Sequence, residues 1–301
     1  MIRILAAALA LGATAVAGCG LGPGKDEGDV ALTVTRDYGL RVMLSKTDSI
    51  HESDTVLRVL DRNAEVTTRY GGGFVQSIDG LAGDQSGGRR SDWFFYVNGI
   101  ESPIGSTQYD LSDGDRIWWD YRDWTAAMRV AAVVGSWPEP FVHGFQGHRW
   151  PTHIDCRARA SACATVSNRL KSAGARVSDA LTDSITVEVG TWDAIRRRPP
   201  VDLLANAPDQ SGVFARFVGT GKKPLLEAFD LRGDPIGSVG KCEGLVAALR
   251  PGDGPPTWVV TGTDACGVAA GAEALDADHL RDRYALVTSP GTAEAVGVPV
   301  P

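Results

Sequence analysis

Three histidines that lie near one another in the sequence are the side chains best suited to hold a metal ion. They are His143, His148 and His153, out of five histidines in the 301-residue chain. A loop could fold their imidazole rings around zinc or copper. Their spacing, however, matches neither one face of a helix nor one face of a strand. We therefore expect ordinary polar loop histidines and assign no metal site.

Four of the five cysteines could form disulfides or bind zinc: Cys156, Cys163, Cys242 and Cys266. An even number of cysteines in an oxidising compartment favours two disulfides. Four cysteines allow three pairings. We favour Cys156–Cys163, which closes a short local loop, together with Cys242–Cys266. A zinc site is the alternative, but the sequence has no two cysteines separated by two residues, which such sites commonly use.

The fifth cysteine, Cys19, has a different setting. Arg3 and the amino terminus give a positive start, Ile4–Val16 is a run of apolar and small residues, and Ala17-Gly18 precedes the cysteine. These are the parts of a secretory signal. The run is too short for a permanent membrane helix, which needs about 20 apolar residues. A cysteine at this point is typical of bacterial lipoproteins, in which the thiol accepts a diacylglycerol before the signal is cleaved.

These observations predict where the chain is held. We expect residues 1–18 to be a lipoprotein signal peptide, and residues 19–29 to be a flexible tether that carries lipid on Cys19. Acyl chains anchor a protein because each buried CH₂ contributes about 0.8 kcal/mol. The predicted location is the extracytoplasmic face of the cell membrane. The alternative is an ordinary signal peptide followed by an incidental cysteine.

Net charge and motifs exclude several functions. The formal net charge of −7 argues against nucleic acid as a partner, because a phosphate backbone needs clustered positive charge. The sequence has no Gly-x-Ser-x-Gly and no His-Glu-x-x-His motif. Gly221-Lys222 lacks the other residues of a phosphate loop. We therefore expect no catalytic residue, no enzyme activity and no cofactor.

Alternating apolar residues and turn signals predict a small domain of one helix and several strands over residues 30–124. Ser53 or Asp54 is placed to cap the helix, and Asn98-Gly99 predicts a tight hairpin because both residues tolerate positive φ. The expected strands are Val30–Thr35, Arg41–Ser45, Phe74–Ile78, Trp93–Val97 and Arg116–Tyr121.

The same stretch resembles a known domain. The resemblance rests on Tyr70-Gly71 with Gly73-Phe74-Val75, Ser77–Gly80, Trp93–Gly99, Tyr109–Asp115 and Ile117–Trp119. These residues resemble the carboxyl-terminal domain of transcobalamin and intrinsic factor, which recurs in bacterial surface lipoproteins. The resemblance implies one helix on a mixed, β-grasp-like sheet. In the vitamin carriers this domain closes over one face of a corrinoid. The carriers' large all-helical domain has no counterpart here.

Aromatic residues on the predicted strands form the candidate ligand site. Alternation sends Trp93, Phe95 and Val97 to one face of the sheet and Phe94 with Tyr96 to the other. One helix covers only one face, so some rings must meet a ligand, a partner or the rest of the chain. The candidate ligand-binding residues are Tyr96, Trp119, Tyr121 and Trp124. The alternative is that the second domain covers them.

Residues 125–288 read as a second domain of the α/β type, which makes the whole chain α+β. Met128–Val134, Ser184–Val189 and Thr257–Thr261 are predicted strands, each ending in a Gly-Ser or Gly-Thr corner. If they are parallel, the corners share one sheet edge and could bind a ligand there. Such corners are also the usual turn from a strand into a helix. We expect residues 289–301 to be a disordered tail.

The sequence therefore favours a membrane-anchored binding protein. It would capture a ring-bearing small molecule, with cobalamin a possible ligand, or an envelope protein. A structural or interaction lipoprotein without a small ligand is the first alternative. A hydrolase built on the α/β domain is the second.

Overall fold

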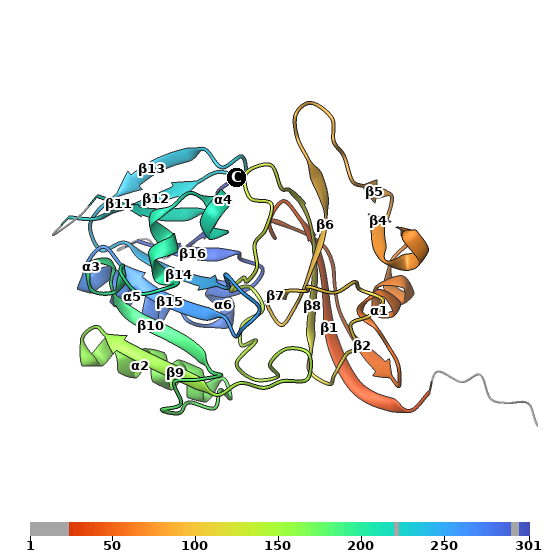
Figure 1. Cartoon of the computed structure of the whole chain (residues 1–301), viewed down its shortest axis with the longest axis horizontal. Helices are drawn as coiled ribbons and strands as arrows, with labels where there is room; N and C mark the ends of the chain where they lie inside the picture. The colour runs from red at the N-terminus through yellow and green to blue at the C-terminus, as the bar shows by residue number, and fades with distance from the viewer. Residues whose placement is uncertain (1–23, 220–222, 290–294) are drawn as a thin grey trace, which may run out of the picture.

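The computed structural model describes residues 24–219, 223–289 and 295–301. The predicted signal peptide and Cys19 lie outside the described residues. Helices make up 19% and strands 39% of the chain, in several separate sheets, so the α+β class is confirmed. Figure 1 shows two groups of strands, with the segment around residues 124–150 running between them. The division into domains at about residue 124 stays a prediction.

The first group is a five-stranded mixed sheet in the order β2-β1-β8-β6-β7. Its central pair, β1 and β8, is parallel, and its other pairs are antiparallel. The hairpin between β6 and β7 turns at Asn98 and Gly99, both at positive φ, as expected. The strands are β1 (Asp26–Arg36), β2 (Arg41–His51), β6 (Ser91–Val97), β7 (Ile100–Glu101) and β8 (Arg116–Asp123).

A single helix and a small sheet cover one face of the first sheet. Helix α1 (Val56–Asn63) buries Val56, Val59 and Leu60 in this core. Its cap is Thr55, which accepts from the Arg58 amide, and neither of the two expected residues. Asp54 is engaged elsewhere, because it accepts from the Arg62 guanidinium. The small sheet consists of β3 (Val66–Arg69), β4 (Phe74–Ile78) and β5 (Leu81–Ala82), with the 3₁₀ turn η1 (Tyr70–Gly72) between β3 and β4.

The second group is a six-stranded sheet in the order β17-β16-β14-β15-β10-β9. Three neighbouring strands are parallel, namely β9 (Thr152–Arg157), β10 (Ile185–Thr191) and β15 (Thr257–Gly262). The other three are antiparallel: β14 (Gly244–Leu249), β16 (Ala285–Thr288) and β17 (Val296–Val298). The second and third predicted strands correspond to β10 and β15, which are parallel neighbours.

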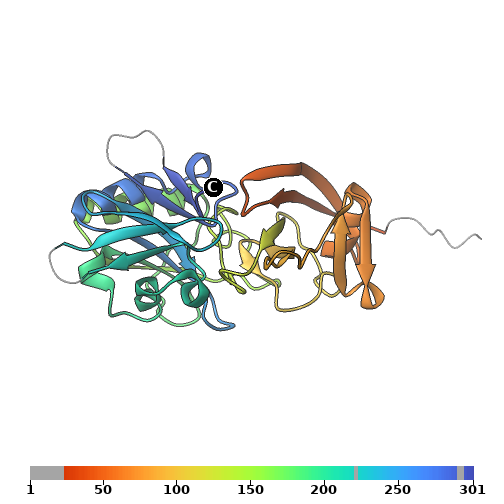
Figure 2. The same ribbon diagram turned by 90° about the horizontal axis from the view of Figure 1, so that it is seen from above.

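Different layers cover the two faces of the six-stranded sheet. Helix α5 (Ala265–Glu273) packs on one face beside α2 (Ala160–Ser172). The antiparallel strands β11 (Ala215–Val218), β12 (Leu225–Phe229) and β13 (Pro235–Val239) cover the other face, where Phe217 and Leu226 join Leu245 and Val259 in one core. Figure 2 shows these layers to the side of the first sheet. Shorter helices are α3 (Trp192–Ile195), η2 (Val201–Ala205), α4 (Pro208–Ser211) and α6 (Ala277–Leu280).

Two expected elements differ in the structure. Met128–Val134 is not a strand, because its backbone amides form hydrogen bonds with both groups of strands. The amide of Val133 donates to the carbonyl of Gly99, and the amide of Val134 donates to the carbonyl of Tyr284. The expected disordered tail is wrong for its last residues. There, β17 extends the sheet beside β16 and buries Val298. Residues 290–294 lie outside the described residues.

Two disulfides connect elements of the second group. Cys156 of β9 is bonded to Cys163 of α2, with 6.0 Å between their Cα atoms. Cys242, just before β14, is bonded to Cys266 in the first turn of α5, with 4.7 Å between their Cα atoms. This is the pairing favoured from the sequence. No helix within the described residues is long and apolar enough to cross a membrane.

Candidate functional site

The two faces of the first sheet carry different aromatic clusters, as strand alternation predicts. Trp119 packs beneath α1 and stacks on Phe95, with 4.8 Å between ring centroids. On the opposite face Tyr96 and Trp118 meet Tyr284, which immediately precedes β16. The second sheet therefore covers part of the aromatic face of the first.

Burial corrects two of the four candidate ligand-binding residues. Tyr96 is 0% exposed and Trp119 is 2% exposed, so neither ring can stack on a ligand in this structure. Tyr96 is covered by Tyr284. For this residue the alternative expectation holds, in which the second half of the chain covers the rings. Trp119 faces the core beneath α1, because one-residue alternation turns it away from Trp118.

Tyr121 is half-buried, but its position is structural. Its hydroxyl donates to the carbonyl of Ala82, at 2.9 Å, and its ring lies against Trp93. These contacts hold β5 against the first sheet. Tyr121 therefore supports the small sheet and does not line the cavity that holds the fourth candidate, Trp124.

Trp124 lines an open cavity of about 470 Å³, which we call the aromatic cavity. The residue comes directly after β8, and the Arg90 guanidinium lies over its ring, 5.0 Å from the centroid. Phe94 of β6 and Met128 of the connecting segment supply the other apolar walls, and Met128 is 74% exposed. The full lining is Asp92, Phe94, Glu101, Trp124, Met128 and Arg129.

One buried arginine shapes the aromatic cavity from behind. The Arg122 guanidinium lies 3.8 Å from the centre of the Phe94 ring and is 0% exposed. It donates to the carbonyl oxygens of Ala127 (2.7 Å) and Met128 (3.1 Å). Arg122 therefore fixes both Phe94 and the segment that carries Met128, so the apolar walls are held in place before any ligand binds.

The polar wall of the aromatic cavity holds both signs of charge. Glu101 lies 3.5 Å from the Arg129 guanidinium. Burial raises the pKa of Glu101, and the neighbouring Arg122 and Arg129 oppose that shift. Burial also raises the pKa of Asp92. A ring held between Trp124 and Phe94 would thus have polar side chains along one edge.

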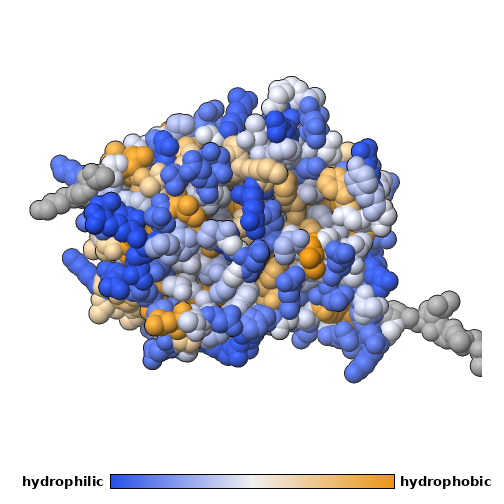
Figure 3. Space-filling model, in the orientation of Figure 1, coloured by the Kyte–Doolittle hydropathy of each residue, from blue (hydrophilic) through white to orange (hydrophobic). Residues whose placement is uncertain are grey.

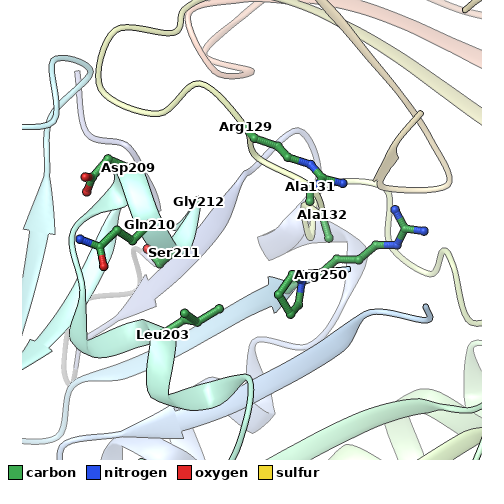
Figure 4. Close-up of a pocket in the computed structure, with 11 residues that line it drawn as sticks. Arg129, Ala131, Ala132, Leu203, Asp209, Gln210, Ser211, Gly212 and Arg250 are labelled. Atoms are coloured by element: carbon green, nitrogen blue, oxygen red, sulfur yellow. The ribbon is translucent and has the colours of Figure 1, made fainter. Parts of the chain in front are cut away.

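A second cavity, of about 260 Å³, adjoins the first, and we call it the arginine cavity. Arg129 lines both cavities. Figure 4 shows the side chains that line the arginine cavity, with Leu203, Gln210 and Ser211 on one side and Arg129 with Arg250 on the other. Leu203 belongs to η2, and Gln210 and Ser211 to α4, so the second half of the chain supplies this wall.

The three clustered histidines are not gathered at one point. His143 Nδ1 lies 2.6 Å from Glu139 Oε1, and His148 Nε2 lies 3.2 Å from Asp183 Oδ2. His153 sits on β9. These side chains have separate surroundings and do not define a shared site.

Cys242, Asp264 and Cys266 form the one group of metal-type ligands found within the described ranges. The two sulfurs are bonded to each other. Asp264 accepts from the backbone amides of Cys242, Cys266 and Gly267, which makes it a helix cap. These contacts account for the group without a metal.

The strand corners of the second sheet leave little room for a ligand. A Cβ atom added to Gly262, at the end of β15, would lie 2.6 Å from the carbonyl carbon of Gly267. The corner therefore packs directly against α5. The first predicted corner, after Val134, follows no strand of this sheet. The shared edge of three corners, which required all three predicted strands to be parallel in one sheet, therefore does not form.

The sequence did not identify five of the cavity residues, namely Asp92, Phe94, Glu101, Met128 and Arg129. Alternation did place Phe94 on the face of Tyr96, which was a usable signal. Asp92 lies on the same strand, β6, two residues before Phe94. Glu101 belongs to a two-residue strand, and Met128 and Arg129 belong to a segment without regular structure, so periodicity gives no information about these three. Figure 3 shows apolar surface in separate patches between polar areas, so composition alone does not mark the site.

The comparisons with known proteins cover only part of the chain. A family model described as a domain of unknown function (DUF4430) matches residues 53–123, from just before α1 to the end of β8. No curated protein matches the sequence. A crystal structure of a candidate metal-binding protein from Ruminococcus gnavus ATCC 29149 aligns with 17% identity and a TM-score of 0.26. The alignment covers 32% of this chain and 98% of that one.

Proposed function

We propose that the chain is an extracytoplasmic, membrane-anchored binding protein whose aromatic cavity holds a ring-bearing small molecule. The observation that carries the proposal is the cavity itself, where Phe94, Trp124 and Met128 leave apolar surface open to solvent. Its volume of about 470 Å³ lies within the usual range of about 300–1,000 Å³ for ligand sites. Aromatic rings and a thioether suit flat, polarisable ligands.

A corrinoid is the ligand that the sequence resemblance suggests. The family match spans β6 and β7, which supply Asp92, Phe94 and Glu101 to the cavity. Because the site is open, a large ring system could lie across Trp124 and project into solvent. Protoporphyrin and riboflavin carry different ring systems, so comparing them with cobinamide tests whether the cavity selects for a corrin.

Replacing Trp124 by Ala is expected to weaken ring binding by about tenfold, because stacking and burial on one indole ring are worth about 1.4 kcal/mol or more. Calorimetric titration of residues 20–301 with cobinamide, protoporphyrin and riboflavin measures this loss. The matched control is Tyr70→Ala, which removes an aromatic ring that is 88% exposed and outside the aromatic cavity.

Each result decides a different part of the proposal. Binding that Trp124→Ala weakens and Tyr70→Ala does not would support the aromatic cavity. Binding that Trp124→Ala does not weaken would place the ligand elsewhere and overturn the assignment of the aromatic cavity as the ligand site. If none of the three rings binds at high micromolar concentration, the small-ligand function is lost.

The membrane anchor is proposed from the sequence around Cys19. Two disulfides in the remaining chain suit an oxidising, extracytoplasmic compartment. Cys19→Ser is expected to abolish incorporation of labelled palmitate and to release the protein from the membrane fraction. Cys163→Ser, which removes a cysteine of the folded part, should keep the label. A Cys19→Ser variant that is still labelled would contradict the proposed lipidation site.

A second candidate is an interaction protein without a small ligand. The observation that favours it is a pair of exposed rings at the far side of the first sheet, Tyr70 and Phe74, beside a shallow cavity of about 570 Å³. Exposed aromatic residues are enriched where proteins meet. This candidate would lead if no ring-bearing ligand binds the aromatic cavity.

A further inference from the structure

Three arginines lie around the junction of the two cavities. Arg122, Arg129 and Arg250 all act electrostatically on one carboxylate, that of Glu101. Of these arginines only Arg129 makes an ion pair among the described residues, and its partner is the same Glu101. Buried arginines are normally paired with a carboxylate. Other carboxylates lie near these cations, because Asp120 acts on Arg122 and Asp253 acts on Arg250. Asp92 and Asp209 also line the two cavities. Within the described part of the chain, however, no carboxylate forms an ion pair with Arg122 or Arg250.

Two of these cations are buried and incompletely hydrogen-bonded. Arg122 is 0% exposed and Arg250 is 6% exposed. The Nε–H of Arg122 and the Nη1 group of Arg250 have no hydrogen-bond partner within the described part of the chain. An unpaired buried donor costs about 1–3 kcal/mol, and more when the group is charged. The other donors of Arg250 are satisfied by the carbonyls of Asp253 and Gly254.

Arg129 is the cation that a ligand could reach. Its side chain is 52% exposed and lines both cavities. The distance of 3.5 Å to Glu101 is long for a charge-assisted hydrogen bond, so its donors are not fully used. A ligand in the aromatic cavity can therefore contact Arg129, which also lines the arginine cavity.

We infer that the ligand of the aromatic cavity carries an anionic group, which Arg129 binds at the mouth of the arginine cavity. This inference rests on the proposed function, since the ring must occupy the aromatic cavity. Arg122 and Arg250 supply a positive field from behind, where low local polarity makes charges act strongly. Glu101 is the built-in counter-ion with which the ligand's anion competes. A carboxylate, sulfonate or phosphate on a flat ring fits this arrangement.

The test compares two fluorescent probes that share their rings and differ in charge. 8-Anilinonaphthalene-1-sulfonate carries an anionic sulfonate, and N-phenyl-1-naphthylamine is neutral. We expect the wild-type protein to bind the sulfonate about tenfold more tightly. Arg129→Gln should abolish that preference, because it removes the contacted charge. Glu101→Gln should increase the preference a few-fold, because it removes the competing carboxylate.

The outcomes separate this inference from the proposed function. If Trp124→Ala weakens neither probe, the rings do not occupy the aromatic cavity and the proposed function fails with these ligands. If Trp124→Ala weakens both probes but Arg129→Gln leaves the sulfonate preference unchanged, the ring site stands and the anion inference is overturned. Loss of the preference in Arg129→Gln alone, with neutral-probe binding retained, supports the inference. Circular dichroism of each variant checks that it is folded.

Discussion

Replacing Asp120 by Ala is expected to lower the free energy of unfolding by about 4 kcal/mol. Asp120 of β8 is 0% exposed and accepts four hydrogen bonds. The donors are the backbone amides of Tyr38 and Gly39, at 3.1 Å each, and the hydroxyls of Thr35 (2.6 Å) and Tyr284 (2.9 Å). The variant would leave two buried amides unpaired, and each costs about 1–3 kcal/mol.

The same carboxyl should make stability depend on pH. Burial raises the pKa of Asp120 from 3.8 to about 6, against the hydrogen bonds from Thr35 and Tyr284. A raised pKa means that the folded state favours the protonated form. The associated stabilisation is fully present below pH 3.8 and is lost as the pH rises through about 6.

Urea unfolding at several values between pH 4 and pH 7 measures this effect. The wild-type free energy of unfolding should fall over this range by up to about 3 kcal/mol more than that of Asp120→Ala, since one pKa unit is worth about 1.4 kcal/mol. Asp61→Asn, on the exposed side of α1, serves as the control and should follow the wild type. Parallel pH profiles for the wild type and Asp120→Ala would contradict the assigned pKa.

Replacing Arg122 by Ala is expected to cost about 4 kcal/mol as well, and to abolish ring binding. The guanidinium donates to the carbonyls of Ala127 and Met128 and fills the space beneath Phe94. Its removal leaves two carbonyls without their donor and opens a cavity, and large-to-small changes of buried residues cost about 2–5 kcal/mol. The segment that carries Met128 would then lose its attachment to β8.

Equilibrium unfolding and probe titration together test the role of Arg122. Arg116→Ala is the matched control, because it removes an exposed arginine from the same strand and should change the free energy of unfolding by less than about 0.5 kcal/mol. Arg122→Lys keeps a charge but cannot reproduce the planar fork that reaches both carbonyls, so it should recover stability only in part. A loss below about 1 kcal/mol in Arg122→Ala would show that the buried fork does not hold the segment.

One strand, β8, contributes residues both to the buried cluster around Asp120 and to the support behind the aromatic cavity. β8 sends Trp118 and Asp120 toward Tyr284. Arg122, two residues further on, lies under Phe94 at the edge where this cover ends. A ligand site can remain at that edge because the second half of the chain covers Tyr96 but leaves Trp124 half-exposed.

Local signals determined much of the fold. Alternation along Trp93–Val97 and Arg116–Tyr121 determined which rings share a face, because successive strand side chains must point in opposite directions. Asn98-Gly99 determined the β6–β7 turn through the positive φ that both residues adopt. The short separation of Cys156 and Cys163 favoured their pairing. Each of these depends on residues close together in the sequence.

Only the tertiary structure decided which of those faces stays open. Tyr284 covers Tyr96, although the two residues are far apart in the sequence. The backbone of Met128–Val134 forms hydrogen bonds with both groups of strands. Likewise, β17 is a strand only because it pairs with the edge of β16 that the rest of the sheet leaves unpaired. Burial depends on summed contacts between distant segments, which no local pattern records. The sequence by itself therefore determined where the aromatic rings lie on their strands, and the packing of the two halves decided that Trp124, rather than Tyr96 or Trp119, meets solvent.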